Sequence, residues 1–139
     1  MAPPKTRLDP VVKLEEQREE LSLRAMAEAA RKLNLANKRL SQAKARASAD
    51  ERRRASASDW QLAELSHTRA LLDARVAEQE VRTASQESGV TRDAYAAVHS
   101  KAESLRRAAA ARKNEITQQR ETAERREQDE LAILRHGKK

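Results

Sequence analysis

The sequence predicts an all-α protein in which two long helices pair as an antiparallel coiled-coil hairpin. Charged residues make up 37% of the chain and aromatic residues only 1%, so there is little material for a globular core. Only two glycines and three prolines interrupt 139 residues rich in Ala, Leu, Glu, Gln and Arg, which lose little entropy in a helix. Apolar residues recur at steps of three and four, which is typical of helices that pair along a narrow seam.

The first helix is expected from about residue 9 to about residue 54. Asp9 and Pro10 suit its start, because Asp accepts hydrogen bonds from free amides and Pro fits the first helical position. The apolar positions expected to face a partner helix are Leu14, Leu21, Ala25, Ala29, Leu33, Ala36, Leu40, Ala43 and Ala47. The steps between residues 21 and 33 are all of four residues, which predicts a stutter that relaxes the supercoil. So many alanines predict a partner helix at close range.

The stretch "SASDWQ", residues 56–61, predicts a turn at about 54–59. Ser58 and Gln61 fit a capping box, and Ser56 is an equally good cap. Residues 31–54 carry nine basic and two acidic side chains. Folding back at the turn brings this block beside the acidic side chains of Asp59, Glu64, Asp73, Glu78 and Glu80. Residues 1–139 are therefore expected to form a single, monomeric hairpin.

The second helix is expected from about residue 59 to about residue 135, with Gly137 ending it. Its predicted seam comprises Leu62, Leu65, Leu72, Val76, Val90, Ala94, Tyr95, Val98, Leu105, Ala109, Arg112, Ile116, Leu131, Ile133 and Leu134. Gly89 leaves two possibilities open. It is either an interior glycine, at a cost of about 1 kcal/mol, or a C-cap that divides the segment into two helices. If continuous, this helix outruns the first and overhangs it.

The residue pattern predicts no enzyme, no cofactor and no metal site. His67, His99 and His136 are far apart, there is no cysteine, and no glycine-rich loop is present to hold a phosphate. No segment has the apolar length of a signal peptide or membrane span, so we expect a cytoplasmic protein. The basic block lacks stacking aromatics, so no nucleic-acid partner is expected. Trp60 either packs at the turn or anchors a partner.

Several stretches resemble the FliJ/YscO family of the type III export apparatus, which serves flagella and injectisomes. They are "RLDPVVKLEEQREELSLRAMAEA" at the start, Trp60, Tyr95, "SKAESLRR", "QQRETAERREQ" and Asp129-Glu130-Leu131. The resemblance implies a two-helix coiled coil like the central stalk of rotary ATPases, with Gly89 inside a continuous helix. It also implies a cytoplasmic protein that works at the export apparatus of the inner membrane.

The resemblance further implies the partners, which are a hexameric export ATPase, the membrane protein of the export gate, and export chaperones. Such a protein promotes assembly and activity of the ATPase. By position, the candidate ATPase contacts are Leu8, Val12, Leu131, Leu134 and Arg135. The candidate gate contacts are Trp60, Ser66, Ala70, Asp73 and Ala77. The alternatives are a generic coiled-coil scaffold or, with less support, a basic helical protein that binds nucleic acid.

Overall fold

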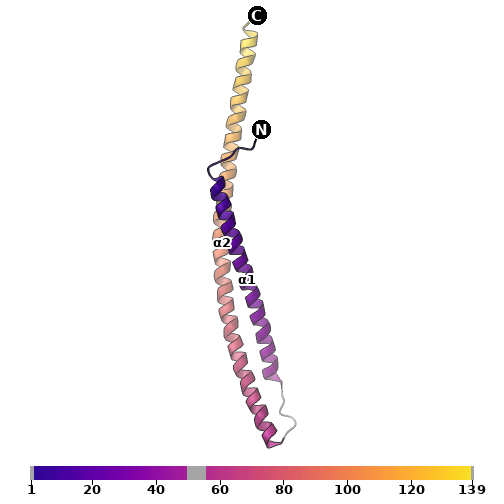
Figure 1. Ribbon diagram of the computed structural model, residues 1–139. Helices are drawn as coiled ribbons and strands as arrows, with labels where there is room; N and C mark the ends of the chain where they lie inside the picture. The colour runs from indigo at the N-terminus through magenta and orange to yellow at the C-terminus, as the bar shows by residue number, and fades with distance from the viewer. Residues whose placement is uncertain (1, 50–55, 139) are drawn as a thin grey trace. The chain divides into compact units, whose positions relative to one another are not determined.

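The structure, a computed structural model, describes residues 2–49 and 56–138 and contains two helices. Helix α1 runs from Asp9 to Ser48 and helix α2 from Ala57 to His136, 40 and 80 residues long. The two helices pack against each other with opposite chain directions, and the described residues include no strand (Figure 1). The predicted all-α helical hairpin is therefore confirmed. No helix among the described residues has the length and apolarity needed to cross a membrane.

Contacts divide the chain into two compact units, each containing a stretch of both helices. The terminal unit comprises Met1–Glu20 and Ala97–Lys139, and the central unit comprises Leu21–Ala96. Both units contain the same antiparallel pair, but they differ in the side chains that lie between the helices.

In the central unit, the helices meet along a seam of alanines. On α1 the buried residues are Ala29, Ala36 and Ala43, and on α2 they include Ala77 and Ala84. The alanines on each helix are seven residues apart, which is the spacing of a coiled-coil heptad. Because alanine has no side chain beyond Cβ, helices joined in this way can pack closely.

The predicted stutter in α1 is wrong. Leu21 is 64% exposed and Ala25 is exposed, whereas Ser22 and Met26 are half-buried. With these two positions in place, the seam keeps alternating steps of three and four without interruption. The prediction used apolar residues only and therefore chose Leu21, whereas the seam position in that turn is Ser22.

The predicted seam at the start of α2 is also wrong. Its four large apolar residues are exposed: Leu62, Leu65, Leu72 and Val76. The half-buried positions in this stretch are Ala63, Glu64, His67, Ala70 and Ala74. Val90 is likewise exposed, while Ser88 is buried. The physical reason is the small size of alanine at three of these positions, which allows the helices to pack closely.

Helix α2 is continuous through Gly89, so the division into two helices does not occur. A Cβ atom at Gly89 would have no atom within 4 Å to clash with. At the other end α2 stops at His136, and the Gly137 amide donates to the Ile133 carbonyl at 2.8 Å. Gly137 therefore follows the last helical residue, as predicted.

The helix starts follow specific caps. Ser56 caps α2, because its Oγ accepts from the Asp59 amide at 3.4 Å and its carbonyl accepts from the Trp60 amide at 3.0 Å. Helix α2 thus begins at Ala57, ahead of the predicted start, and the alternative cap at Ser58 is not used. Helix α1 ends at Ser48. The predicted end of helix one near residue 54, and the first part of the predicted turn, lie outside the described residues.

Asp9 begins α1 but does not act as the forward cap that was predicted. Its carboxylate reaches back and accepts from the Thr6 amide and the Thr6 hydroxyl, both at 3.1 Å. The turn from Thr6 to Asp9 therefore precedes the helix and fixes the direction in which the chain enters it.

The terminal unit has a more polar seam. Ala102 and Ala109 are buried on α2, but the buried residue of α1 is Glu15, which is 4% exposed. Leu14, predicted to lie in the seam, is 48% exposed. Beyond Ile116 every residue from 117 to 138 is exposed, and this part of α2 extends past the start of α1 (Figure 1). The predicted overhang is confirmed.

Candidate functional site

The geometry of the described residues points to interaction surfaces rather than to a reaction centre. Among them, no group of three or more His, Asp or Glu side chains is placed to hold a metal ion. His67 and His99 are half-buried, and His136 is exposed. The surfaces of interest are a charge cluster in the terminal unit, the exposed end of α2, and a groove in the central unit.

The charge cluster joins acidic residues of α1 to basic residues of α2. Arg106 donates to Glu16 at 3.1 Å and to Glu19 at 2.8 Å. Glu19 also lies 3.3 Å from Nδ1 of His99. Lys101 lies 3.4 Å from the buried carboxylate of Glu15. These contacts fix the register of the two helices at the open end of the hairpin.

A further ion pair and a nearby intrahelical contact extend this pattern. Lys113 of α2 lies 3.3 Å from the Asp9 carboxylate, which links the first turn of α1 to α2. Arg18 donates to Glu15 at 2.8 Å from the same helix. Glu15 thus has two cationic neighbours, which explains how a carboxylate can occupy a position of 4% exposure.

The electrostatics of the cluster favour its charged state. Partial burial acts to raise the pKa of Glu19, but hydrogen bonds from His99 and Arg106 outweigh it and leave the pKa below its ordinary value. The pKa of Asp9 is lowered chiefly by the hydrogen bond from the Thr6 amide, with a contribution from Lys113. The hydrogen bond to Glu16 is the main reason that the pKa of Arg106 is raised.

The five candidate ATPase contacts fall on two separate surfaces of the terminal unit. Leu8 and Val12 are half-buried in the helix pair, and Leu8 lines a groove together with Ala108, Ala111 and Ile116. Leu8 and Val12 therefore contribute to packing, and part of Leu8 faces the groove.

The other candidates lie on the free end of α2. Leu131 and Leu134 are 56% and 62% exposed, and Arg135 is exposed. Leu131 follows Ile116 by fifteen residues, which corresponds to about 22 Å along a helix. Ile133, which was expected in the seam, is 69% exposed as well. The end of α2 thus offers apolar side chains without a helix partner among the described residues.

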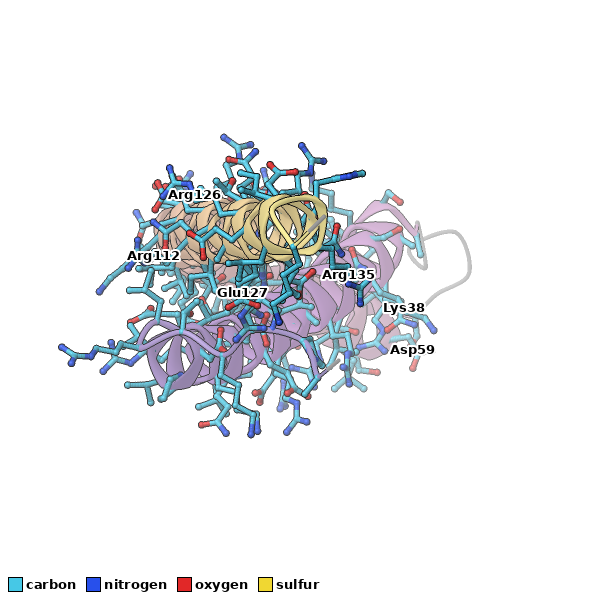
Figure 2. The ribbon with its side chains drawn as sticks, turned by 90° about the horizontal axis from the view of Figure 1, so that it is seen from above. Lys38, Asp59, Arg112, Arg126, Glu127 and Arg135 are labelled. Atoms are coloured by element: carbon cyan, nitrogen blue, oxygen red, sulfur yellow. The ribbon has the colours of Figure 1, made fainter. Side chains whose placement is uncertain are left out.

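Charged residues surround this free part of α2. Figure 2 shows Arg126 on one side of the helix and Arg135 on the other, both pointing outward. Glu127 points in a different direction from its neighbour Arg126. From residue 117 to residue 130 the helix is polar on all sides apart from Ala123, which is typical of a helix that is solvated or bridges to other molecules rather than packing into a core.

Three of the five candidate gate contacts share a groove of the central unit. Ser66, Ala70 and Asp73 line it from α2, and Ala43 and Arg46 line it from α1. Its small side chains leave a shallow trough between the helices. Two positively charged side chains, Arg46 and Arg69, also line it.

The remaining two gate candidates differ sharply in exposure. Trp60, in the first turn of α2, is 49% exposed. Ala77 is 6% exposed and packs in the alanine seam. Trp60 is therefore available to a partner, whereas Ala77 is covered within the hairpin.

Sequence reasoning missed one surface of the central unit. Leu62, Leu65, Leu72 and Val76 were expected to pack on α1 but face solvent. A second signal was present, because the alanines between them also recur at seam spacing. The smaller side chains form the seam, and the larger ones form an exposed stripe.

The chain matches no protein-family model, no curated protein and no solved structure.

Proposed function

We propose that the chain is a stalk component of a type III export apparatus, of the kind that the FliJ/YscO family provides. In this role it binds a hexameric export ATPase through the free end of α2 and promotes assembly and activity of the ring. One observation carries the proposal. Helix α2 is twice as long as α1 and continues as a single exposed helix from residue 117 to residue 136.

A protein in the centre of a six-membered ring faces identical subunits in several directions, and a helix with one apolar face can satisfy only some of them. Residues 117–136 instead carry charged side chains around the helix, with Leu131 and Leu134 near its end. Such a surface supports contacts that are individually weak and can be exchanged between subunits.

The central unit supports the second part of the proposal. The groove beside Ser66, Ala70 and Asp73, together with exposed Trp60, is the surface offered to the export gate and to export chaperones. The protein would then reside in the cytoplasm beside the inner-membrane export apparatus. It acts in protein transport, in flagellum biogenesis or type III secretion, without being an enzyme itself.

The test is ATP hydrolysis by the export ATPase encoded in the same genome, with and without the chain. Wild-type chain should raise the turnover rate, and the double variant Leu131→Asp/Leu134→Asp should lose most of the stimulation. The matched control is Leu21→Asp/Leu35→Asp, which places the same charges on exposed leucines of α1 and should stimulate like wild type.

Circular dichroism should show equal helix content for all three proteins, since each substitution is at an exposed site. If the wild-type chain neither binds the ATPase nor changes its turnover, the stalk proposal is wrong and a generic coiled-coil scaffold becomes the better explanation. Equal stimulation by both double variants would show that the free end of α2 is not the contact.

A further inference from the structure

A second apolar surface lies on α2 within the central unit. Leu62, Leu65, Leu72 and Val76 are 65%, 68%, 53% and 59% exposed, and we call these four residues the outer stripe. Their steps of three, seven and four residues are those of a coiled-coil seam with one position missing. Arg69 occupies the missing position.

The outer stripe is on the face of α2 that points away from α1. The positions that pack on α1 include Ala63, Ala70 and Ala77, which share the d position of one heptad, and His67 and Ala74, which share its a position. The outer stripe falls at positions c and f of that heptad, on the opposite side of the helix. Helix α1 therefore cannot cover it, however closely the hairpin packs.

The two flanks of this face carry opposite charges. Asp73, Glu80 and Glu87 follow one flank at heptad spacing, and Arg75 and Arg82 follow the other. All five residues are exposed. Their side chains make no hydrogen bond or ion pair with any residue that the structure describes.

We propose that the outer stripe binds a second copy of this chain, with the two α2 helices parallel and in register. In a parallel pair, a residue on one flank faces the residue five positions later on the opposite flank of its partner. Arg75 then meets Glu80 of the partner subunit, and Arg82 meets Glu87 of the partner subunit. Two-fold symmetry gives four such pairs.

The reverse orientation is disfavoured by the same charges. In an antiparallel pair, each flank lies beside the same flank of the partner. The arginine flank then faces arginines, and the acidic flank faces carboxylates. Like charges that face each other across a coiled coil destabilise the pairing of its helices. The charge pattern thus selects both a partner, which is an identical helix, and an orientation.

The apolar side chains favour the same arrangement. Taking the outer stripe as its own heptad, Leu65 and Leu72 are at d, and Leu62 and Val76 are at a. Leu at d with a β-branched residue at a favours parallel two-stranded coiled coils. Arg69 is at an a position, where a charged side chain lowers stability but opposes slipped registers.

The pairing joins two folded hairpins and is weak. Both helices of each hairpin already fill their own seam, so a single chain folds without its partner. Four apolar layers bury less than the area of a standard interface, so we expect a dissociation constant on the order of tens of µM. The dimer forms when the chain is concentrated locally, and it is independent of any ATPase contact at the free end of α2.

Sedimentation velocity of the full chain, from about 2 to about 500 µM, measures this association directly. Wild type should shift from monomer to dimer over this range. Leu72→Glu should remain monomeric throughout, whereas Leu21→Glu, at an exposed leucine of α1, should dimerise like wild type. A wild-type chain that remains monomeric at the highest concentration overturns the proposal and leaves the outer stripe to a different protein.

Charge variants test the choice of partner. At the paired positions, Arg75→Glu/Arg82→Glu makes both flanks acidic and Glu80→Lys/Glu87→Lys makes both basic, so each protein alone should be monomeric. An equimolar mixture should form a heterodimer at least as tight as the wild-type dimer, because every flanking pair is then attractive. A mixture that does not associate, or variants that still self-associate as wild type does, would contradict the pairing.

A single introduced cysteine tests the orientation, since the chain has none of its own. In a parallel in-register pair, Leu65→Cys places its thiol beside the thiol of the partner, so oxidation should form a disulfide dimer in high yield. Leu21→Cys is the matched control and should crosslink only slowly. Crosslinking of both variants at the same slow rate would overturn the parallel arrangement.

Discussion

The central and terminal units contain the same helix pair but differ in the side chains that are buried between the helices. In the central unit, alanines such as Ala36 and Ala84 are buried on both helices, whereas in the terminal unit α2 buries Ala102 and Ala109 but the buried residue on α1 is Glu15. Packing of alanines depends on shape and needs no particular ionisation state. Pairing of carboxylates with Arg106 and Lys101 depends on charge and hydrogen-bond geometry. The central part of the hairpin therefore depends on packing, and its open end depends in addition on ionisation.

The strongest test of the comparison places a carboxylate in the alanine seam. Ala36→Glu should destabilise the chain by about 3 kcal/mol, because the charge loses hydration at a position of 6% exposure. Urea unfolding followed by circular dichroism measures the change. The matched control is Ala30→Glu, which introduces the same residue at an exposed position of α1 and should change the stability little.

Equal stability of Ala36→Glu and wild type would contradict the view that the alanine seam is tightly packed. It would mean that the central unit accommodates a carboxylate as readily as the terminal unit accommodates Glu15. The two units would then differ only in composition and not in how they are held together.

A second test strengthens the central unit at the glycine inside α2. Gly89→Ala should stabilise the chain by about 0.5–1 kcal/mol, because glycine carries more backbone entropy in the unfolded chain. Nothing within 4 Å would meet the new Cβ atom, so no clash offsets the gain. Thermal unfolding should show a higher midpoint for this variant, while Gly137→Ala, just beyond α2, should have a smaller effect. A lower midpoint for Gly89→Ala would show that the glycine is needed for packing.

The hairpin was predictable because helix propensity, scarce glycine and proline, and stepwise apolar spacing all favoured it. The seam was only partly predictable, since two sets of residues on α2 both have heptad spacing. Hydrophobicity favours Leu65 and Leu72 for the seam, whereas close helix approach favours Ala63 and Ala70, and a single sequence does not state the distance between helices. In the structure the seam contains Ala63 and Ala70, and Leu65 and Leu72 are exposed.

The charge cluster was beyond sequence reasoning for a different reason. Glu15 and Glu19 occupy seam positions, and a search for apolar steps passes over them in favour of Leu14 and Leu21. The register that brings Arg106 to Glu19 follows from the whole fold, because 87 residues separate them. The sequence did predict that opposite charges on the two helices favour the hairpin. It assigned this role to the basic residues of 31–54, however, and not to the cluster in the terminal unit.

The smallest of the expected effects distinguishes the two units by pH. The pKa values of Glu19 and Asp9 are lowered in the folded chain, from ordinary values of 4.5 and 3.8. A carboxyl group whose pKa is lower in the folded state stabilises that state above its unfolded pKa, and this contribution is lost as the pH falls through the folded pKa. Acidification from pH 7 should therefore leave the chain unchanged until about pH 5 and then loosen the open end of the hairpin first.

Amide hydrogen exchange, corrected for the intrinsic rate at each pH, measures this order. Protection of residues 12–20 should fall several-fold between about pH 6 and about pH 3, while protection of residues 29–43 should change much less. In the variant Asp9→Asn/Glu19→Gln the protection of residues 12–20 should be lower at neutral pH and should vary less with pH. If both segments of α1 lost protection in parallel, the terminal and central units would unfold as one, and the alanine seam would confer no independent stability.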